Sequence, residues 1–171
     1  SIARERKITF TANEVSAVRA DLVRQVVNGD RVLVGDGREI GDQEEKFDAI
    51  LIDAPCTGLG ALRRRPEVRW RRTLQDLREL TQLQRELIES AVRALKVGGV
   101  LGYATCSPHL AETSIQVSDL KRKHLTMEQL DISPYLPTNL ENSERDMAMS
   151  LWTHRSDTDA MYLALFKKKS E

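Results

Sequence analysis

Two cysteines are the residues of this chain best suited to chemistry. Cys56 lies in the stretch Ile-Leu-Ile-Asp-Ala-Pro-Cys-Thr-Gly, and Cys106 lies in Tyr-Ala-Thr-Cys-Ser-Pro. Each follows a short apolar run that predicts a buried parallel strand, and open α/β sheets keep their active sites where such strands end. A thiol with a pKa of about 8.5 is partly ionised near neutral pH, and the thiolate is a strong nucleophile. The two thiols therefore predict one shared cleft.

The elements that must position these thiols follow from the alternation of apolar runs with helical periodicity. The predicted strands are residues 7–12, 31–34, 47–52 and 100–104. The predicted helices are residues 14–27, 73–95 and 111–124. Two runs joined by a polar turn predict a closing antiparallel hairpin, at residues 147–152 and 160–167. This order predicts an α/β fold with a parallel sheet and helices on both of its faces.

The ends and faces of these elements carry further expectations. Asn28-Gly29 is predicted to end the first helix, and Gly98-Gly99 the second. The run at residues 47–52 is apolar enough for a central buried strand. Residues 38–46 read as a polar loop, and residues 125–146 give no clear pattern. The first helix is predicted from apolar residues at helical spacing, Val15, Val18, Leu22 and Val26.

Composition bounds the class of protein. The 171 residues suit one domain, and 26 basic against 26 acidic side chains give no overall basicity. No apolar run approaches the roughly 18–20 residues of a membrane helix, and the first residues do not resemble a signal peptide. Two cysteines without a secretory signal favour reduced thiols and a cytoplasmic protein. The histidines form no metal-binding spacing, at His109, His124 and His154.

The chain resembles the Nop/Sun (Fmu-like) family of RNA cytosine-5 methyltransferases nearly from end to end. Residues 53–58 match the fourth motif of that family, residues 105–107 match the sixth, and residues 63–70 match the stretch after the fourth motif. Residues 95–99 and the hairpin also match. The resemblance implies a Rossmann-like methyltransferase fold, S-adenosylmethionine as cofactor and RNA, most naturally ribosomal RNA, as partner. No membrane partner is implied.

The resemblance also assigns catalytic roles. Carbon 5 of cytosine is a poor nucleophile until a thiolate adds at carbon 6, and the family gives this attack to Cys106. Cys56 would assist the elimination that releases the enzyme. Asp53 would hold the cytosine edge, and burial would favour its protonated form. The competing interpretation of Asp53 is a strand-end carboxylate that caps a loop.

Acidic residues near the first strands are the candidates for cofactor binding. The resemblance implies that Glu14 holds the ribose hydroxyls and that Asp36 contacts the adenine amine, with Arg19 and Asp53 also at the cofactor. Glu14 is expected to follow a strand and to open a helix. Taken without the family, Glu14 and Asp36 are better interpreted as ordinary helix-start or turn acids.

A basic loop between the cysteines is the candidate RNA contact. Arginine pairs with phosphate and an indole can stack on a base, so the loop predicts a track for single-stranded RNA. Arg64, Arg65, Arg69 and Trp70 are the residues expected to bind RNA, around a cytosine flipped out of its stack. The competing interpretation is a solvated loop with Trp70 packed inward. The arginines of the loop are Arg63, Arg64, Arg65, Arg69, Arg71 and Arg72.

The family's first motif, a glycine-rich loop after the first strand, has no counterpart in residues 1–171. We therefore expect the chain to be an N-terminally truncated part of a methyltransferase catalytic domain, inactive alone. The absent strand would lie between those at 8–12 and 48–52, and both neighbours would keep unpaired backbone groups.

Three other functions stay open at this point. Cys56 is the nucleophile if the chain follows DNA cytosine methyltransferases, in which the Pro-Cys thiol attacks. A non-catalytic RNA-binding module would keep the fold without the chemistry. Residues 50–53 resemble a Walker B strand, but the chain lacks the GxxxxGK[ST] loop of a nucleotide hydrolase.

Overall fold

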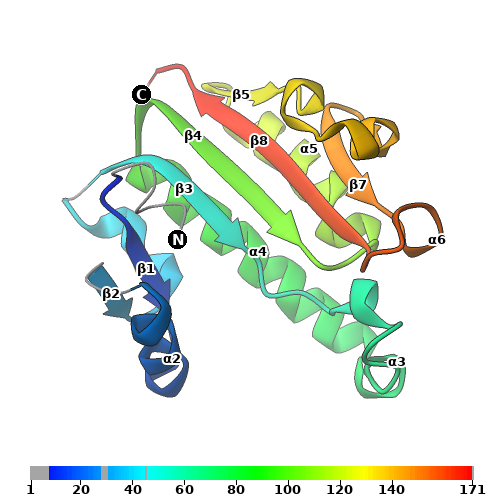
Figure 1. The fold of residues 1–171 in the computed structure, drawn as a ribbon. Coiled ribbons are helices and arrows are strands. Elements are labelled where there is room, and N and C mark those ends of the chain that lie inside the picture. Colours follow the sequence, from blue (N-terminus) through cyan, green and yellow to red (C-terminus); the bar gives the residue numbers. More distant parts are fainter. Residues whose placement is uncertain (1–7, 28–30, 45, 171) are drawn as a thin grey trace.

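The computed structural model describes residues 8–27, 31–44 and 46–170 (Figure 1). The strands are β1 (Thr11–Glu14), β2 (Arg31–Val34), β3 (Phe47–Asp53), β4 (Leu95–Thr105), β5 (Met127–Leu130), β6 (Glu144–Arg145), β7 (Ala148–Leu151) and β8 (Met161–Lys168). The α-helices are α2 (Ala17–Val27), α3 (Val68–Arg71), α4 (Leu74–Ala94), α5 (Ser114–Lys123) and α6 (Thr153–Ser156). The 3-10 segments are η1 (Gly37–Asp42), η2 (Leu59–Ala61), η3 (Leu110–Glu112), η4 (Ser133–Tyr135) and η5 (Thr138–Ser143).

The strands form two sheets that are divided between β1 and β3 (Figure 1). β1 pairs with β2 in parallel, and β3 pairs with β4 in parallel with Asp53 opposite Ala104. β8 lies antiparallel to β4, and β5 and β7 pair with its other edge. The predicted α/β fold with a closing β7–β8 hairpin is confirmed. Within the described residues, β1 pairs only with β2 and β3 only with β4, as expected at the gap between them.

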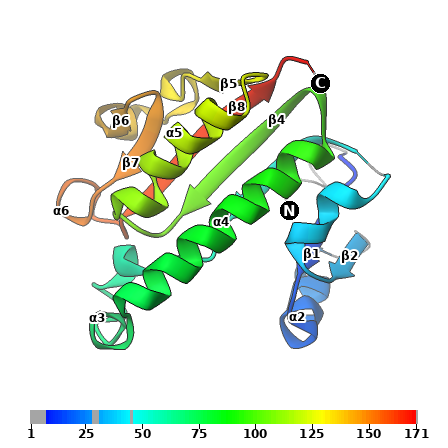
Figure 2. The same ribbon diagram turned by 180° about the vertical axis from the view of Figure 1, so that it is seen from behind.

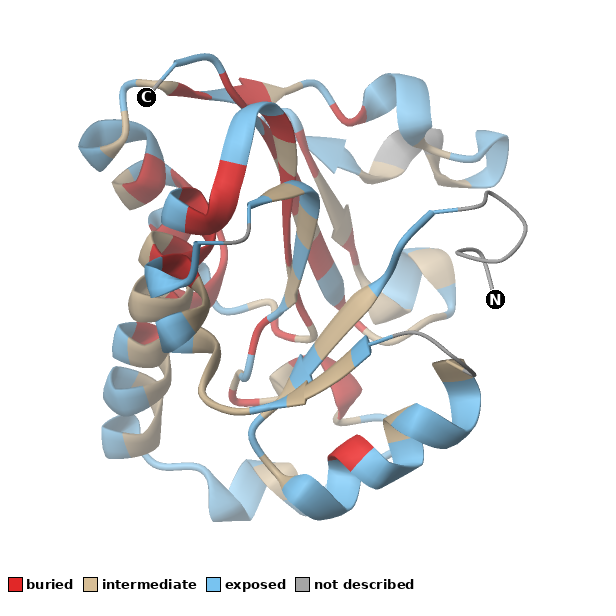
Figure 3. Ribbon diagram, turned by 90° about the vertical axis from the view of Figure 1, so that its left-hand side faces the viewer, coloured by how far each residue is buried: buried red, intermediate tan, exposed pale blue. Residues whose placement is uncertain are grey.

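Helix α4 supports the six-stranded sheet. Its start is fixed by a capping box, in which Thr73 Oγ1 accepts from Asp76 N at 3.2 Å and the Asp76 carboxylate accepts from Thr73 N at 2.7 Å. Helices α4 and α5 lie on the same face of the sheet (Figure 2), although the sequence predicted helices on both faces. Buried residues concentrate in β4, β8 and these helices (Figure 3). No helix in the described part of the chain has the length and apolarity to cross a membrane.

The junction between α4 and β4 differs from the prediction. Leu95 is extended, with φ −82° and ψ 133°, and pairs with Phe47 of β3. The helix therefore ends at Ala94 because Leu95, which is buried, is already part of the sheet. The prediction that Gly98 and Gly99 end the helix was wrong: both lie inside β4.

Elements near the N-terminus are shifted from their predicted bounds. β1 begins at Thr11 and includes Glu14, so Glu14 ends a strand and does not open a helix. Helix α2 begins at Ala17. Lys7 and the predicted Asn28-Gly29 cap lie outside the described residues. Residues 38–46, predicted as loop, contain most of η1, and residues 125–146 contain β5, which the sequence did not reveal.

Apolar surface remains open on both sides of the gap. Leu51 of β3 is 70% exposed, so the prediction of a central buried strand was wrong for these residues. Exposure alternates along β3, with Ala49, Leu51 and Asp53 exposed and Ile50 and Ile52 packed on the core, because α4 covers only one face of the strand. Val15, which precedes α2, is also exposed, as are Val18, Leu22 and Val26 of α2.

Candidate active site

The two cysteines meet at the carboxyl ends of β3 and β4. Their sulfur atoms lie 3.3 Å apart, and both thiols are free and partly buried. The parallel pairing of β3 and β4 brings them together, and it continues past β3 through a bond from Ala54 N to Ala104 O of 2.9 Å. The two strand ends thus bring the thiols into direct contact.

The contact makes the two thiols chemically unequal. The hydrogen bond from Cys56 lowers the pKa of Cys106 to about 7, against the opposing effects of burial and of the Asp53 and Glu112 carboxylates. The same contact, together with burial, raises the pKa of Cys56. These shifts favour ionisation of Cys106, whose thiolate would accept a hydrogen bond from Cys56.

Gly60 packs against the backbone of Cys106. Its N–H donates to the carbonyl oxygen of Cys106 at 2.9 Å, and its own carbonyl accepts from Ala160 N at 3.0 Å. A Cβ atom at this position would overlap the carbonyl oxygens of both neighbours. Only glycine allows this approach, which ties the loop after Cys56 to Cys106 and to the residue preceding β8.

The backbone and the side chain of Thr57 are both hydrogen-bonded. Its N–H and hydroxyl donate to the two carboxylate oxygens of Glu112 at 2.8 and 2.6 Å, and its carbonyl accepts from Arg72 Nε at 3.2 Å. Gln84 of α4 donates to Pro55 O at 2.9 Å and to Glu112 at 3.2 Å. The residues on both sides of Cys56 are therefore fixed by buried polar side chains.

Asp53 ends β3 at the edge where the cysteines lie. It is exposed, so the protein alone does not desolvate its carboxyl group, contrary to the expectation of burial. Its negative charge acts on Cys106, where it opposes ionisation of the thiol. The placement leaves the carboxyl group open to a ligand that enters beside the thiols.

Glu14 ends β1, and the candidate cofactor residue Arg19 binds it. The Glu14 carboxylate accepts from Ser16 N at 2.8 Å and from the Arg19 guanidinium at 2.7 Å, and the first of these bonds chiefly lowers its pKa. Both bonds go to Oε1. The backbone N–H of Val15 also acts on this carboxylate and lowers its pKa.

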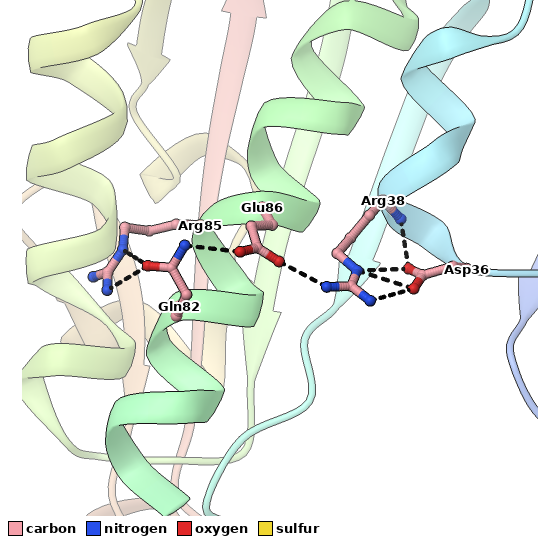
Figure 4. Close-up of polar contacts among 5 residues, drawn as sticks. All are labelled: Asp36, Arg38, Gln82, Arg85 and Glu86. Carbon is pink, nitrogen blue, oxygen red and sulfur yellow. Dashed lines mark hydrogen bonds and ion pairs between the residues drawn. The ribbon is translucent and has the colours of Figure 1, made fainter. Parts of the chain in front are cut away.

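Asp36 follows β2 and caps η1. It accepts from Arg38 N at 2.9 Å and from the Arg38 guanidinium, which lowers its pKa (Figure 4). Arg38 also donates to Glu86 of α4 at 2.9 Å, and a chain of polar contacts continues to Gln82 and Arg85. Arg38, which the sequence did not single out, thus ties this acid to α4.

Several arginines of the basic loop are already engaged in ion pairs or hydrogen bonds within the protein. Arg63 pairs with Asp157 at 2.6 Å, and the Arg64 guanidinium binds both carboxylate oxygens of Asp159. Arg64 also acts electrostatically on Cys106. Arg72 donates to Thr57 O, as described above. The ion pairs hold the loop against the turn between β7 and β8.

The outer part of this loop carries an exposed aromatic residue. Trp70 of α3 is 80% exposed, so the alternative in which it packs inward was wrong. The guanidinium of Arg69 lies over its ring, 5.4 Å from the centroid. Arg65 is exposed on the same loop. Within the described residues, no cluster of His, Cys, Asp and Glu side chains suits a metal ion.

The model of one protein family, described as 16S rRNA methyltransferase RsmB/F, matches residues 3–167. The chain belongs to the RsmB/F family. Protein Rv1407 of Mycobacterium tuberculosis is 48% identical over 160 residues, which are 92% of this chain and 35% of that protein. Ribosomal RNA small subunit methyltransferase B of Yersinia enterocolitica is 36% identical over 166 residues, 95% of this chain and 36% of the relative. The chain spans about a third of the length of these relatives.

A solved structure from the same class of methyltransferases supports this fold. The crystal structure of NSun6 from Pyrococcus horikoshii with SFG superposes with a TM-score of 0.82 at 28% identity, over 99% of this chain and 44% of that one. The Rossmann-like methyltransferase fold expected from the sequence is thereby confirmed. The thiol pair lies in residues 53–58 and 105–107, the two stretches that the sequence analysis matched to motifs of the methyltransferase family.

Two polar residues of this RsmB/F-family chain were missed by the sequence analysis. Gln84 and Glu112 are fully buried and bond to the Cys56 segment. A signal existed for Gln84, which precedes the buried Ile88 by one helical turn and so faces inward. Glu112 gave no local signal, because its partner Thr57 is 55 residues away.

Proposed function

We propose that this chain carries the catalytic residues of an RNA cytosine-5 methyltransferase that acts on ribosomal RNA with S-adenosylmethionine. The observation that carries the proposal is the Cys56–Cys106 contact of 3.3 Å, in which Cys106 is the more acidic thiol. Membership of the RsmB/F family supports ribosomal RNA as the substrate class. The fold alone would not, since one fold hosts many functions.

The chemistry assigned to the thiols is covalent catalysis. The Cys106 thiolate adds to carbon 6 of a flipped cytosine, and the electron pair of the carbon 5–carbon 6 double bond becomes available at carbon 5. After methylation, a base removes the proton from carbon 5, the electrons of that C–H bond re-form the carbon 5–carbon 6 double bond, and the bond from carbon 6 to Cys106 breaks with its electron pair returning to sulfur as the thiolate. Cys56 lies beside Cys106 and assists this release. Asp53 holds the polar edge of the base.

The residues present suit S-adenosylmethionine. Glu14 and Asp36 both have lowered pKa values, so each offers an ionised acceptor, Glu14 for ribose hydroxyls and Asp36 for the adenine amine. Arg19 orients the Glu14 carboxylate. When bound there, S-adenosylmethionine supplies the electrophilic methyl group.

The test uses the full-length gene product with labelled S-adenosylmethionine and ribosomal RNA. We expect 5-methylcytosine from the wild type and none from Cys106→Ala. RNA binding that persists without both thiols, with no methylation by the wild type on any RNA, would support a non-catalytic binding module in its place.

A further inference from the structure

Glu112 is an acidic residue with no exposed surface, placed behind the thiol pair. A buried carboxylate is costly unless donors compensate for the water it has lost. Three donors do so here: the N–H and hydroxyl of Thr57 and the side-chain amide of Gln84. Because all three are donors, the site is built for a carboxylate that only accepts.

The same residue is anchored to the segment that carries Cys106. The hydroxyl of Tyr103, in β4, donates to the backbone carbonyl of Glu112 at 2.8 Å. Ser107 Oγ, directly after Cys106, lies 3.4 Å from Thr57 Oγ1. Glu112 therefore joins the strand end that bears Cys106 to the loop that bears Cys56.

We propose that Glu112 is a positioning residue that holds Cys56 against Cys106 through its two bonds to Thr57. The proposal deepens the function proposed above, because the step it serves is the release of Cys106 from carbon 6. Gln84 completes the unit by fixing Pro55 on the other side of Cys56. Within the described part of the chain, the side chain of Glu112 bonds to Thr57 and Gln84 and to neither sulfur atom.

The pH profile of Cys106 alkylation tests the proposal without RNA or cofactor. The groups that act on Cys106 are Cys56, Asp53, Glu112 and Arg64. Removing the Glu112 charge alone would make Cys106 more acidic and faster to alkylate. Losing the hydrogen bond from a displaced Cys56 would make it less acidic and slower. The two effects have opposite signs, so the rate separates them.

Glu112→Gln keeps the shape of the side chain but replaces one accepting oxygen with an NH2 group, which faces the donors of Thr57 and Gln84. In the full-length gene product, we expect it to lower the rate of Cys106 alkylation by iodoacetamide at pH 7 about fivefold, as a rise of about one unit in the pKa requires. In the Cys56→Ala background the same change should leave the rate unchanged or increase it. Peptide mapping by mass spectrometry assigns the label to Cys106.

The matched control is Gln116→Leu. Gln116 is equally buried and donates to Thr81 O and Ala111 O, but to neither cysteine loop. It should lower thermal stability without moving the alkylation midpoint. If Glu112→Gln does not fold, Thr57→Val removes one of the two bonds to Glu112 and should slow alkylation in the same direction.

If Glu112→Gln leaves the rate of Cys106 alkylation unchanged or raises it when Cys56 is present, the proposal is overturned. An equal slowing in the presence and in the absence of Cys56 also overturns it. This result is independent of methylation. If the thiol profile behaves as expected and the full-length wild type still methylates no RNA, the proposed function fails while the positioning role stands. If methylation occurs, Glu112→Gln should accumulate covalent RNA adduct, as Cys56→Ala should.

Discussion

Gly60 donates its backbone N–H to the carbonyl oxygen of Cys106 at 2.9 Å, so the two cysteine segments are joined through their backbones as well as through sulfur. The bond crosses between the loop after β3 and the loop after β4. It depends on the absence of a side chain, because a Cβ atom at Gly60 would overlap the carbonyl oxygens of Cys106 and Ala160. The thiol geometry therefore rests on a tight backbone contact that can be tested by substitution.

Replacing Gly60 with alanine should destabilise the fold. The added methyl group forces backbone apart at a packed junction, and such overpacking costs about 1–3 kcal/mol in the free energy of unfolding. Urea denaturation measures this. Gly35→Ala is the control, since nothing lies within 4 Å of a Cβ atom there. Equal stabilities for the two variants would show that the contact at Gly60 is looser than described.

The reactivity of Cys106 should rise with pH through a midpoint of about 7. Its thiolate is the reactive form, and the hydrogen bond from Cys56 favours that form, so the reaction is slow below the midpoint and level above it. Cys56→Ala should move the midpoint up towards the ordinary thiol value. Alkylation across pH 5–10 measures it, and a midpoint that stays in place would remove Cys56 as the cause.

Trp70→Ala should weaken RNA binding by about 1–3 kcal/mol, the usual contribution of one base stacked on an aromatic side chain. Because Trp70 is exposed, its removal should leave the fold intact, and a loss of affinity would not be due to unfolding. Fluorescence anisotropy with single-stranded RNA measures the affinity in the full-length gene product. Arg122→Ala is the control, an exposed arginine of α5 away from the basic loop. Equal affinities for both variants would remove Trp70 from the RNA track.

Glu14→Gln should weaken binding of S-adenosylmethionine about tenfold, as expected when a hydrogen bond to a charged acceptor is lost. Calorimetric titration of the full-length gene product gives the dissociation constant. The control is Glu39→Gln, an exposed acid in η1. If the two variants bind equally well, Glu14 is an ordinary turn acid, the alternative that the sequence left open.

Features encoded locally were predictable from the sequence. Thr73 caps α4 through neighbours three residues away, and this start was predicted correctly. The meeting of Cys56 and Cys106 followed from two strand ends in a parallel sheet, because adjacent parallel strands end at one edge. Both predictions needed only a short stretch of sequence and a general rule.

Features that depend on distant partners were not predictable in this way. Glu112 and Thr57 meet only when the sheet forms, and no periodicity links them. The end of α4 at Ala94 is set by pairing of Leu95 with Phe47, which overrides the glycines that ordinarily stop a helix. The exposure of Leu51 follows from which face of β3 the helices cover, a property of the whole fold.

The most direct test of the central claim is to trap the enzyme on RNA that contains 5-fluorocytosine at the target position. Fluorine at carbon 5 cannot leave as a proton does, so the covalent adduct persists. The account predicts an adduct with the wild type and with Cys56→Ala, mapped by mass spectrometry to Cys106, and none with Cys106→Ala. An adduct that persists in Cys106→Ala and maps to Cys56 would contradict it and make Cys56 the nucleophile.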